Sequence, residues 1–243
     1  MLACVLIFSG RYAEAPLLLE ETARVARRLG QSAELASAEQ ILYWAHMNLG
    51  MYEQARELLA ASWAFCQESG DAEGIAYHYL SQAQFALLAA TEADSRAGDE
   101  AAYRYAEQSL LLFRGLEHID EGLAWAELGY AAHRLGRPAE ARRHLREALG
   151  SARGARALQT TVSALAHLAA ILADGEPERA VELYALATRH PYIGNSRLWQ
   201  DLLEPRVAAA AARLPPEVVE AARARGREGD WAAAAEHWID ELS

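Results

Sequence analysis

The sequence of 243 residues contains no lysine, and all 23 of its Lys and Arg positions are arginine. A nucleotide-binding phosphate loop needs a lysine, as do Schiff-base and pyridoxal-phosphate chemistry. These sites are therefore excluded from the 243 residues. Only two cysteines occur, Cys4 and Cys66. Two isolated thiols exclude a disulfide framework or a cysteine-rich metal site, and they fit a reducing cytoplasm.

Long apolar runs are also missing. No stretch approaches the roughly 18 to 20 continuous apolar residues of a membrane span. The apolar start at 2–8 has neither the basic flank nor the small-residue cleavage site of a signal peptide. The 34 acidic residues outnumber the 23 basic ones, for a net charge of −11, which argues against binding a phosphate backbone. We therefore expect a cytoplasmic protein that contacts neither a membrane nor nucleic acid directly.

Alanine is abundant, and a short motif recurs around it. Alanine occupies 54 positions, against 7 prolines and 16 glycines, which favours helix nearly throughout. The motif is a glycine, then a tyrosine or proline two positions later, then an alanine after three more. The glycine is expected to end one helix in a left-handed conformation, and the alanine to allow close approach of the next. The four copies lie at 10–15, 50–55, 136–141 and 175–180.

The spacing of these copies predicts one further unit. The motif alanines are 40, 86 and 39 residues apart, so a unit is missing between the second and third copies. Phe65 and Gly74 correspond to Phe113 and Gly122, with an offset of 48. The third unit therefore contains an insertion near 90–98. We predict about five helix pairs over 1–190, the first truncated, and C-terminal capping helices over 191–243.

These patterns predict the individual helices, which form antiparallel pairs. The first helices of the pairs are expected at 33–49, 72–96, 120–135 and 157–173, with a stub at 2–9. The second helices are expected at 13–28, 53–68, 100–114, 139–153 and 178–189. Three more are expected at 196–213, 216–225 and 230–242, because prolines and glycines separate them.

The fourth unit resembles a tetratricopeptide repeat (TPR). Trp125, Leu128 and Gly129 reproduce its Trp-x-x-Leu-Gly pattern, and Ala141 matches its downstream alanine. The period of about 40 residues is longer than the usual 34. In that form, residues 1–190 resemble the repeat arm of STAND signal-transduction ATPases related to the maltose-operon activator. The resemblance implies an all-α, right-handed superhelix of antiparallel helix pairs.

The same resemblance implies a function. Arms of this family bind an inducer within the superhelix and hold an attached ATPase domain inactive until it arrives. The sequence lacks that ATPase and a helix-turn-helix output domain, and its first unit begins in mid-helix. We therefore expect a non-catalytic sensor portion of a larger protein, whose partners are an inducer and an ATPase domain of the same chain. The alternative is a stand-alone scaffold that binds a peptide of another protein in its concave groove.

The sequence offers no catalytic or metal-binding pattern. None of the eight histidines forms an i, i+4 pair, and the zinc motif His-Glu-x-x-His is absent. No nucleophile elbow occurs, and carboxylates such as Asp120 and Glu121 read as solvated helix faces. We therefore expect no enzyme activity, no cofactor and no metal.

Candidate binding residues follow from the repeat pattern, because first helices line the concave surface of such stacks. Helical position relative to Trp125, Ala55 and Tyr77 selects the residues that face the groove. Their aromatic and amide groups suit binding of a peptide or small ligand, although packing between helices would explain each one alone. The predicted groove residues are Gln40, Trp44, Met47, Asn48, His78, Gln82, Phe85, Tyr130, His133 and Arg134.

A local excess of arginine forms a second candidate surface. Residues 133–156 carry a net charge of +5, which leaves −16 for the rest of the chain. This basic patch would suit an acidic partner or a phosphate-bearing ligand. A solvated helix face beside acidic neighbours is the alternative, and the sequence favours it. The residues of the patch are Arg137, Arg142, Arg143, Arg146 and Arg153.

Overall fold

The computed structural model describes residues 2–93, 95–152 and 157–243. Across these ranges the chain forms fourteen α-helices and one short 3-10 helix, without a β-strand. The predicted all-α class is therefore confirmed. The helices are α1 (Leu2–Phe8), η1 (Tyr12–Glu14), α2 (Ala15–Leu29), α3 (Ser32–Asn48), α4 (Tyr52–Ser69), α5 (Ala72–Ala93), α6 (Arg96–Gly115), α7 (Glu121–Arg134), α8 (Pro138–Ser151), α9 (Ala157–Leu172), α10 (Pro177–Thr188), α11 (Pro191–Gly194), α12 (Arg197–Ala211), α13 (Pro216–Glu228) and α14 (Trp231–Glu241).

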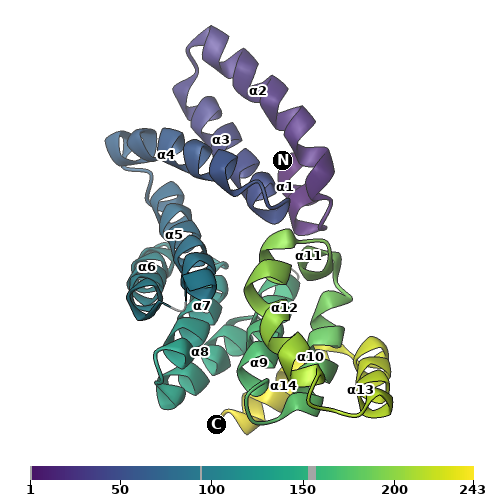
Figure 1. The fold of residues 1–243 in the computed structure, drawn as a ribbon. Coiled ribbons are helices and arrows are strands. Elements are labelled where there is room, and N and C mark those ends of the chain that lie inside the picture. The colour runs from purple at the N-terminus through teal and green to yellow at the C-terminus, as the bar shows by residue number, and fades with distance from the viewer. Residues whose placement is uncertain (1, 94, 153–156) are drawn as a thin grey trace.

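Consecutive helices pack in pairs, as the repeat predicts. The main pairs are α3 with α4, α5 with α6, α7 with α8 and α9 with α10 (Figure 1). The motif glycines Gly10, Gly50 and Gly136 have φ of +73°, +77° and +72°, a conformation that costs glycine little. Gly175 is the exception, because its φ lies outside this left-handed range.

Small residues at the motif positions let the paired helices approach closely. The four motif alanines and Ala106 of the additional third unit are all buried, with at most 3% of their surface exposed. A methyl group at Gly129 would lie 2.7 Å from Leu145 Cγ, so the glycine of the Trp-x-x-Leu-Gly pattern also serves close packing. The alanines are Ala15, Ala55, Ala106, Ala141 and Ala180.

The pair α5–α6 is the longest. Helix α5 has 22 residues and α6 has 20, against 14 in each of α7 and α8. Helix α5 continues through residues 90–93, in the segment that the sequence assigns to an insertion, and α6 begins at Arg96. Added length therefore extends both helices of this pair.

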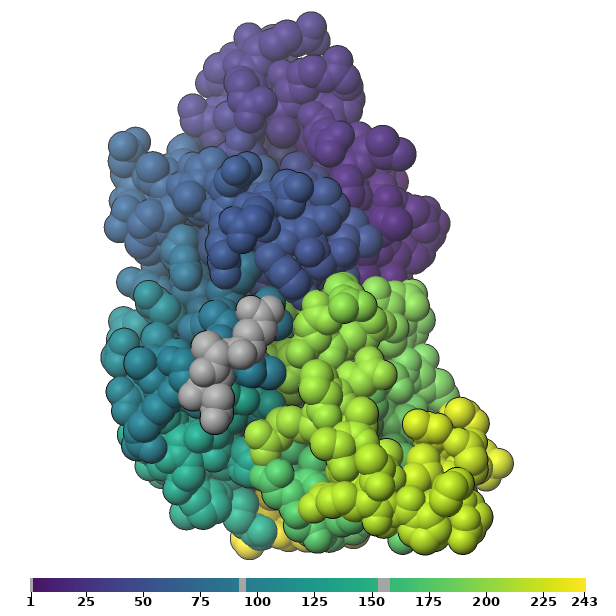
Figure 2. Space-filling view, viewed as in Figure 1, coloured from purple at the N-terminus to yellow at the C-terminus, as the bar shows by residue number. Residues whose placement is uncertain are grey.

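Helices α11 and α12 run back toward the N-terminal pairs. Helix α12 packs against α3, α5, α9 and α10. In Figure 2 the light green surface of α12 adjoins the blue surface of residues near 50. The Tyr12 hydroxyl donates to the Tyr192 carbonyl oxygen at 2.6 Å, and the Ser196 hydroxyl donates to Asn48 Oδ1 at 2.6 Å. These bonds fix the segment after α10 to the start of the chain.

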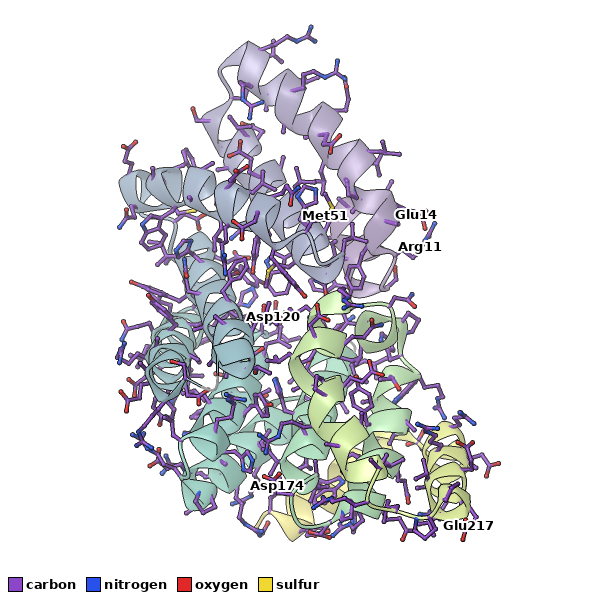
Figure 3. The ribbon with its side chains drawn as sticks, viewed as in Figure 1. Arg11, Glu14, Met51, Asp120, Asp174 and Glu217 are labelled. Carbon is purple, nitrogen blue, oxygen red and sulfur yellow. The ribbon has the colours of Figure 1, made fainter. Side chains whose placement is uncertain are left out.

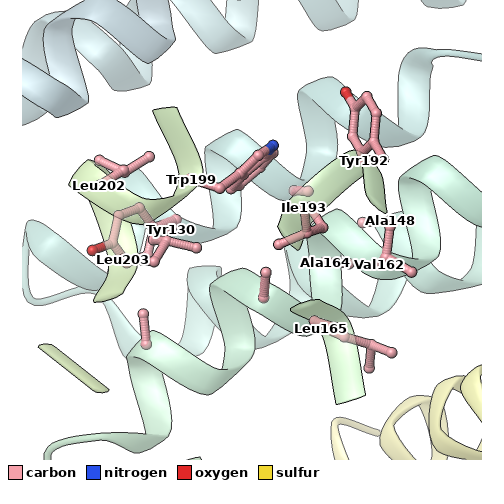
Figure 4. Close-up of a cluster of buried hydrophobic side chains, with 14 of the residues drawn as sticks. Tyr130, Ala148, Val162, Ala164, Leu165, Tyr192, Ile193, Trp199, Leu202 and Leu203 are labelled. Atoms are coloured by element: carbon pink, nitrogen blue, oxygen red, sulfur yellow. The ribbon is translucent and has the colours of Figure 1, made fainter. Parts of the chain in front are cut away.

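The main core lies where α12 meets α7 and α9. Tyr130, Trp199, Leu202 and Leu203 are at most 2% exposed and belong to one apolar cluster with Leu165 of α9 (Figure 4). Helix α13 covers α10, and α14 packs on α8 and α9. Helices α12, α13 and α14 thus all contact the pair α9–α10, and α12 is in addition part of the main core.

Candidate functional site

A cavity of about 750 Å³ lies between the N-terminal helices and the start of α7. Its walls come from α1, α3 and α5, from the turn before α7 and the start of α9, and from His190 before α11. The volume is in the range of binding sites for small organic molecules. The lining residues are Cys4, Val5, Ile7, Phe8, Ser9, Ser37, Gln40, Ile41, Trp44, Glu73, Tyr77, His118, Asp120, Leu123, Gln159 and His190.

One wall of this cavity is aromatic. Trp44 of α3 meets the ring of Tyr77 of α5 edge to face, with centroids 6.0 Å apart. Tyr77 in turn packs on Phe113 at 5.0 Å, and Phe113 stacks on His118 at 5.0 Å. Edge-to-face and stacked contacts of this kind orient the rings. The wall is therefore an aromatic surface formed by Trp44 of α3, Tyr77 of α5 and His118 of the turn, with the buried ring of Phe113 from α6 packed behind them.

The hydroxyl group of Tyr77 lies at the polar end of the cavity. It donates to Asp120 Oδ2, and Asp120 is only 9% exposed. Burial, followed by the charge of Asp120, raises the pKa of Tyr77 far above its usual value of 10, so the phenol stays protonated. The Asp120 carboxylate therefore accepts a permanent hydrogen bond from the aromatic wall. Figure 3 places Asp120 toward the middle of the molecule.

A short turn positions these groups. His118 N–H donates to the Phe113 carbonyl oxygen at 2.8 Å and closes the end of α6. The Asp120 N–H donates to His118 Nδ1 at 3.2 Å, and His118 Nε2 lies 3.5 Å from Glu73 Oε1. Because Nδ1 accepts, the ring proton of neutral His118 is on Nε2, facing Glu73. The turn thus holds one imidazole between two carboxylates.

Helix α1 and His190, before α11, form another side of the cavity. Gln159 Nε2 donates to the Phe8 carbonyl oxygen at 3.2 Å, which ties α1 to the start of α9. His190 Nδ1 accepts from the Tyr192 N–H at 3.2 Å. Burial lowers the pKa of His190 below 6.5, which favours the neutral ring at pH 7. The cavity is thus in contact with the segment that returns to the N-terminal pairs.

Only two predicted groove residues line the cavity. Gln40 and Trp44 of α3 do so, and Gln40 Nε2 donates to the Gly74 carbonyl oxygen at 3.4 Å. Asn48 bonds to Ser196, while Met47 and Phe85 share an apolar cluster with Leu198 of α12. Tyr130 is fully buried and stacks on His167, which also contacts Trp199 of α12. These four side chains therefore face the chain's own helix α12.

The remaining groove candidates lie elsewhere. His78 stacks on Trp63 of α4 with centroids 3.9 Å apart, and Gln82 Nε2 is 3.4 Å from the His78 ring. His133 Nε2 lies 3.5 Å from Asp174, and Arg134 forms a buried ion pair with Asp99 at 2.5 Å. The structure does not bring these four residues to the cavity.

The arginines of the basic patch split between contacts and open surface. Arg137 lies 3.7 Å from Glu140 and over the ring of Tyr103, and Arg142 donates to the Glu241 carbonyl oxygen. Arg143 and Arg146 are exposed on α8. Arg153 lies outside the described residues.

Several cavity residues are missing from the sequence prediction. Asp120 reads as part of a solvated helix face, but it is only 9% exposed and accepts a hydrogen bond from Tyr77. Asp120 comes close to Glu73, Tyr77 and His118 only because α5 packs against α6 and the turn that follows α6. The shared Phe-to-Gly spacing that aligns the second and third units brackets Asp120 and is the one sequence signal that points to this turn.

Other kinds of site find no support in the described ranges. No three His, Cys, Asp or Glu side chains there are grouped as metal ligands. None of the helices found there has the length and apolar character required to cross a bilayer. Comparison with known proteins adds no identification, since no protein-family model and no curated protein matches the sequence.

Proposed function

We propose that this chain is a non-catalytic sensor that binds a small ligand within a TPR-like stack of helix pairs. The cavity of about 750 Å³ carries the proposal. It is lined by α3, α5 and the starts of α7 and α9, the first helices of successive pairs, where a repeat stack of this kind would bind its ligand. The resemblance to STAND arms suggests that the ligand is an inducer and that the partner is an ATPase domain of a larger protein.

The position of α12 favours a small ligand over an extended peptide. Met47, Asn48, Phe85 and Tyr130 would line a peptide groove, but they are at most 6% exposed. Their neighbours include residues of α12, so a peptide would have to displace part of the core. The alternative, a scaffold that binds a partner peptide in its groove, is less favoured for this reason.

Ligand binding at this cavity would be coupled to the arrangement of the helices. A ligand there would touch α1 and His190 at once, as well as the first helices of four pairs. It would therefore stabilise the arrangement in which these elements lie together, and it can shift an equilibrium only by its preference for that arrangement. This is how the sensor would report the ligand to an attached domain.

A fragment screen by ligand-observed NMR tests the proposal. Hits that compete for one site are expected with the wild type and are expected to disappear in Trp44→Ala. Trp63→Ala is the matched control, because Trp63 contacts His78 and is not part of the cavity lining. A screen without any hit that depends on Trp44 would refute the proposal.

A further inference from the structure

The cavity has an unbalanced negative charge at its polar end. Glu73 and Asp120 both contribute carboxylates, and none of the described lining residues is an arginine. In the part of the chain that the structure describes, the ion-pair contacts of both carboxylates are to His118. Lysine is absent from the sequence. Among the residues that the structure describes, no permanent cation therefore faces these two carboxylates across the cavity.

His118 is the basic side chain beside both carboxylates. Its Nδ1 accepts the Asp120 backbone N–H at 3.2 Å and does not donate to the Asp120 carboxylate. The hydrogen bond from Tyr77 to Asp120 adds no charge, because the Tyr77 phenol remains protonated. Asp120 is nearly buried, and a buried carboxylate without a counter-charge is costly. A cation supplied by a ligand would remove this cost.

The remainder of the cavity suits an apolar body attached to that cation. Tyr77 presents its ring beside Asp120, and Trp44 packs against Tyr77. Aromatic rings of this kind attract cations as well as hydrocarbon. Phe8, Ile41 and Leu123 complete an apolar wall. The carboxylates lie beside the ring of Tyr77, so a single ligand could reach both surfaces.

From this arrangement we propose that the ligand is a protonated amine with an apolar or aromatic body. The ammonium group donates hydrogen bonds to Asp120 and Glu73, and the body packs against Trp44 and the apolar wall. Charge-assisted bonds of this type are stronger than neutral ones. The inference rests on the proposed ligand-binding function and specifies the class of ligand.

The test uses three compounds that share an indole body and differ in charge: tryptamine, tryptophol and indole-3-acetate. Dissociation constants are measured by ligand-observed NMR with the full chain. Tryptamine is expected to bind at least about tenfold more tightly than tryptophol, which corresponds to one charge-assisted contact. Indole-3-acetate is expected to bind more weakly than either. Phenethylamine, 2-phenylethanol and phenylacetate form a second series with a smaller body.

Two substitutions test whether the carboxylates cause the preference for tryptamine over tryptophol. Glu73 is 58% exposed in its side chain, so Glu73→Gln should fold normally. It is expected to weaken tryptamine binding several-fold and to leave tryptophol binding unchanged. Asp120→Asn should weaken tryptamine more strongly, provided that its circular dichroism matches the wild type. Glu217→Gln on α13 is the control, since this exposed carboxylate lies far from Asp120 (Figure 3) and should change neither constant.

The outcomes separate this inference from the proposed function. If the alcohols or carboxylates bind as tightly as the amines or more tightly, and their binding depends on Trp44, the inference of an amine ligand is wrong. The proposed ligand-binding site would still stand. The inference of an amine ligand is also wrong if amine binding is unchanged in both Glu73→Gln and folded Asp120→Asn. The same inference is contradicted if the fragment screen gives hits that depend on Trp44 but none of these hits is an amine. If neither the screen nor the two series gives Trp44-dependent binding, both proposals fail.

Discussion

Gly10, a single residue of the repeat motif, has two roles: it forms a turn and it packs closely against another segment. Its φ of +73° ends α1 and turns the chain toward α2. A methyl group at this position would lie 2.3 Å from the backbone carbon and oxygen of Pro191. The same glycine therefore forms a turn within the first unit and a contact surface for the segment that begins α11.

Substitution of Gly10 should separate these two roles. Gly136 has a φ of +72° and no atoms within 4 Å of an added methyl group. Gly136→Ala should therefore lower the free energy of unfolding by about 1–2 kcal/mol, the usual cost of a left-handed alanine. Gly10→Ala should cost about 1–3 kcal/mol more, because the methyl group also overlaps Pro191. Urea unfolding measures both, and equal losses would show that the Pro191 contact is unimportant.

His144 links residue burial to acid sensitivity. Its ring stacks on Trp125 with centroids 5.1 Å apart and is 4% exposed. Burial lowers its pKa from 6.5 to about 4, so the folded chain resists protonation of this ring. Between these pH values the unfolded chain binds more protons, and the free energy of unfolding must fall as the pH decreases from 6.5 to 4.

Replacement of His144 should reduce this acid sensitivity. In His144→Gln, the loss of unfolding free energy between pH 7 and pH 5 should be smaller than in the wild type. The variant is expected to be less stable at pH 7, because the stacking on Trp125 is lost. Urea unfolding at the two pH values gives the comparison. Equal pH-dependent losses in both proteins would contradict the assignment to His144.

At the scale of helices, local signals determined most of what the sequence could predict. The range 157–173 was expected for a helix that occupies Ala157–Leu172, and 139–153 for Pro138–Ser151. Glycines and prolines mark these ends, and their effect is local. The position of α12 could not be predicted from such local signals, because it depends on which apolar faces of distant helices pack together. Trp44 was identified from helical position alone, whereas Asp120 needed the contact with Tyr77.

A buried ion pair shows how these helices are joined. Arg134 at the end of α7 donates to Asp99 Oδ1 in the first turn of α6 at 2.5 Å, and to Thr91 Oγ1 of α5 at 3.2 Å. Both charged side chains are only 7% exposed. The guanidinium group remains charged in the folded protein, so its partner is essential to the junction of three helices.

Removal of the acidic partner should be strongly destabilising. Asp99→Asn would leave a buried arginine without a counter-charge, and we expect a loss of about 3–5 kcal/mol in the free energy of unfolding. The control is Glu53→Gln, whose partner is the exposed Arg56 at 2.9 Å. Such surface pairs contribute about 0–1 kcal/mol. Thermal and urea unfolding compare the two, and a small effect of Asp99→Asn would contradict this role.

For the whole molecule, the course of α11 and α12 changes how the helix pairs depend on one another. In a simple linear array each unit contacts only its neighbours, and unfolding can begin at either end. Here Tyr12 bonds to Tyr192, Asn195 Nδ2 donates to the Gly10 carbonyl oxygen at 3.1 Å, and Tyr52 donates to Asp201 at 2.7 Å. The first two pairs are thus connected directly to the C-terminal helices.

This connection predicts cooperative unfolding of the entire chain. Hydrogen exchange across a urea series should give the same opening free energy for core amides of α2 and α9 in the wild type, and circular dichroism and tryptophan fluorescence should give coincident curves. In Gly10→Ala the contact with Pro191 is disturbed, so amides of α1–α4 should open before those of α9. Gly136→Ala should instead lower both values together. If α2 already opens well before α9 in the wild type, the bonds from residues 192–201 do not couple the two ends, because the first pairs then unfold independently.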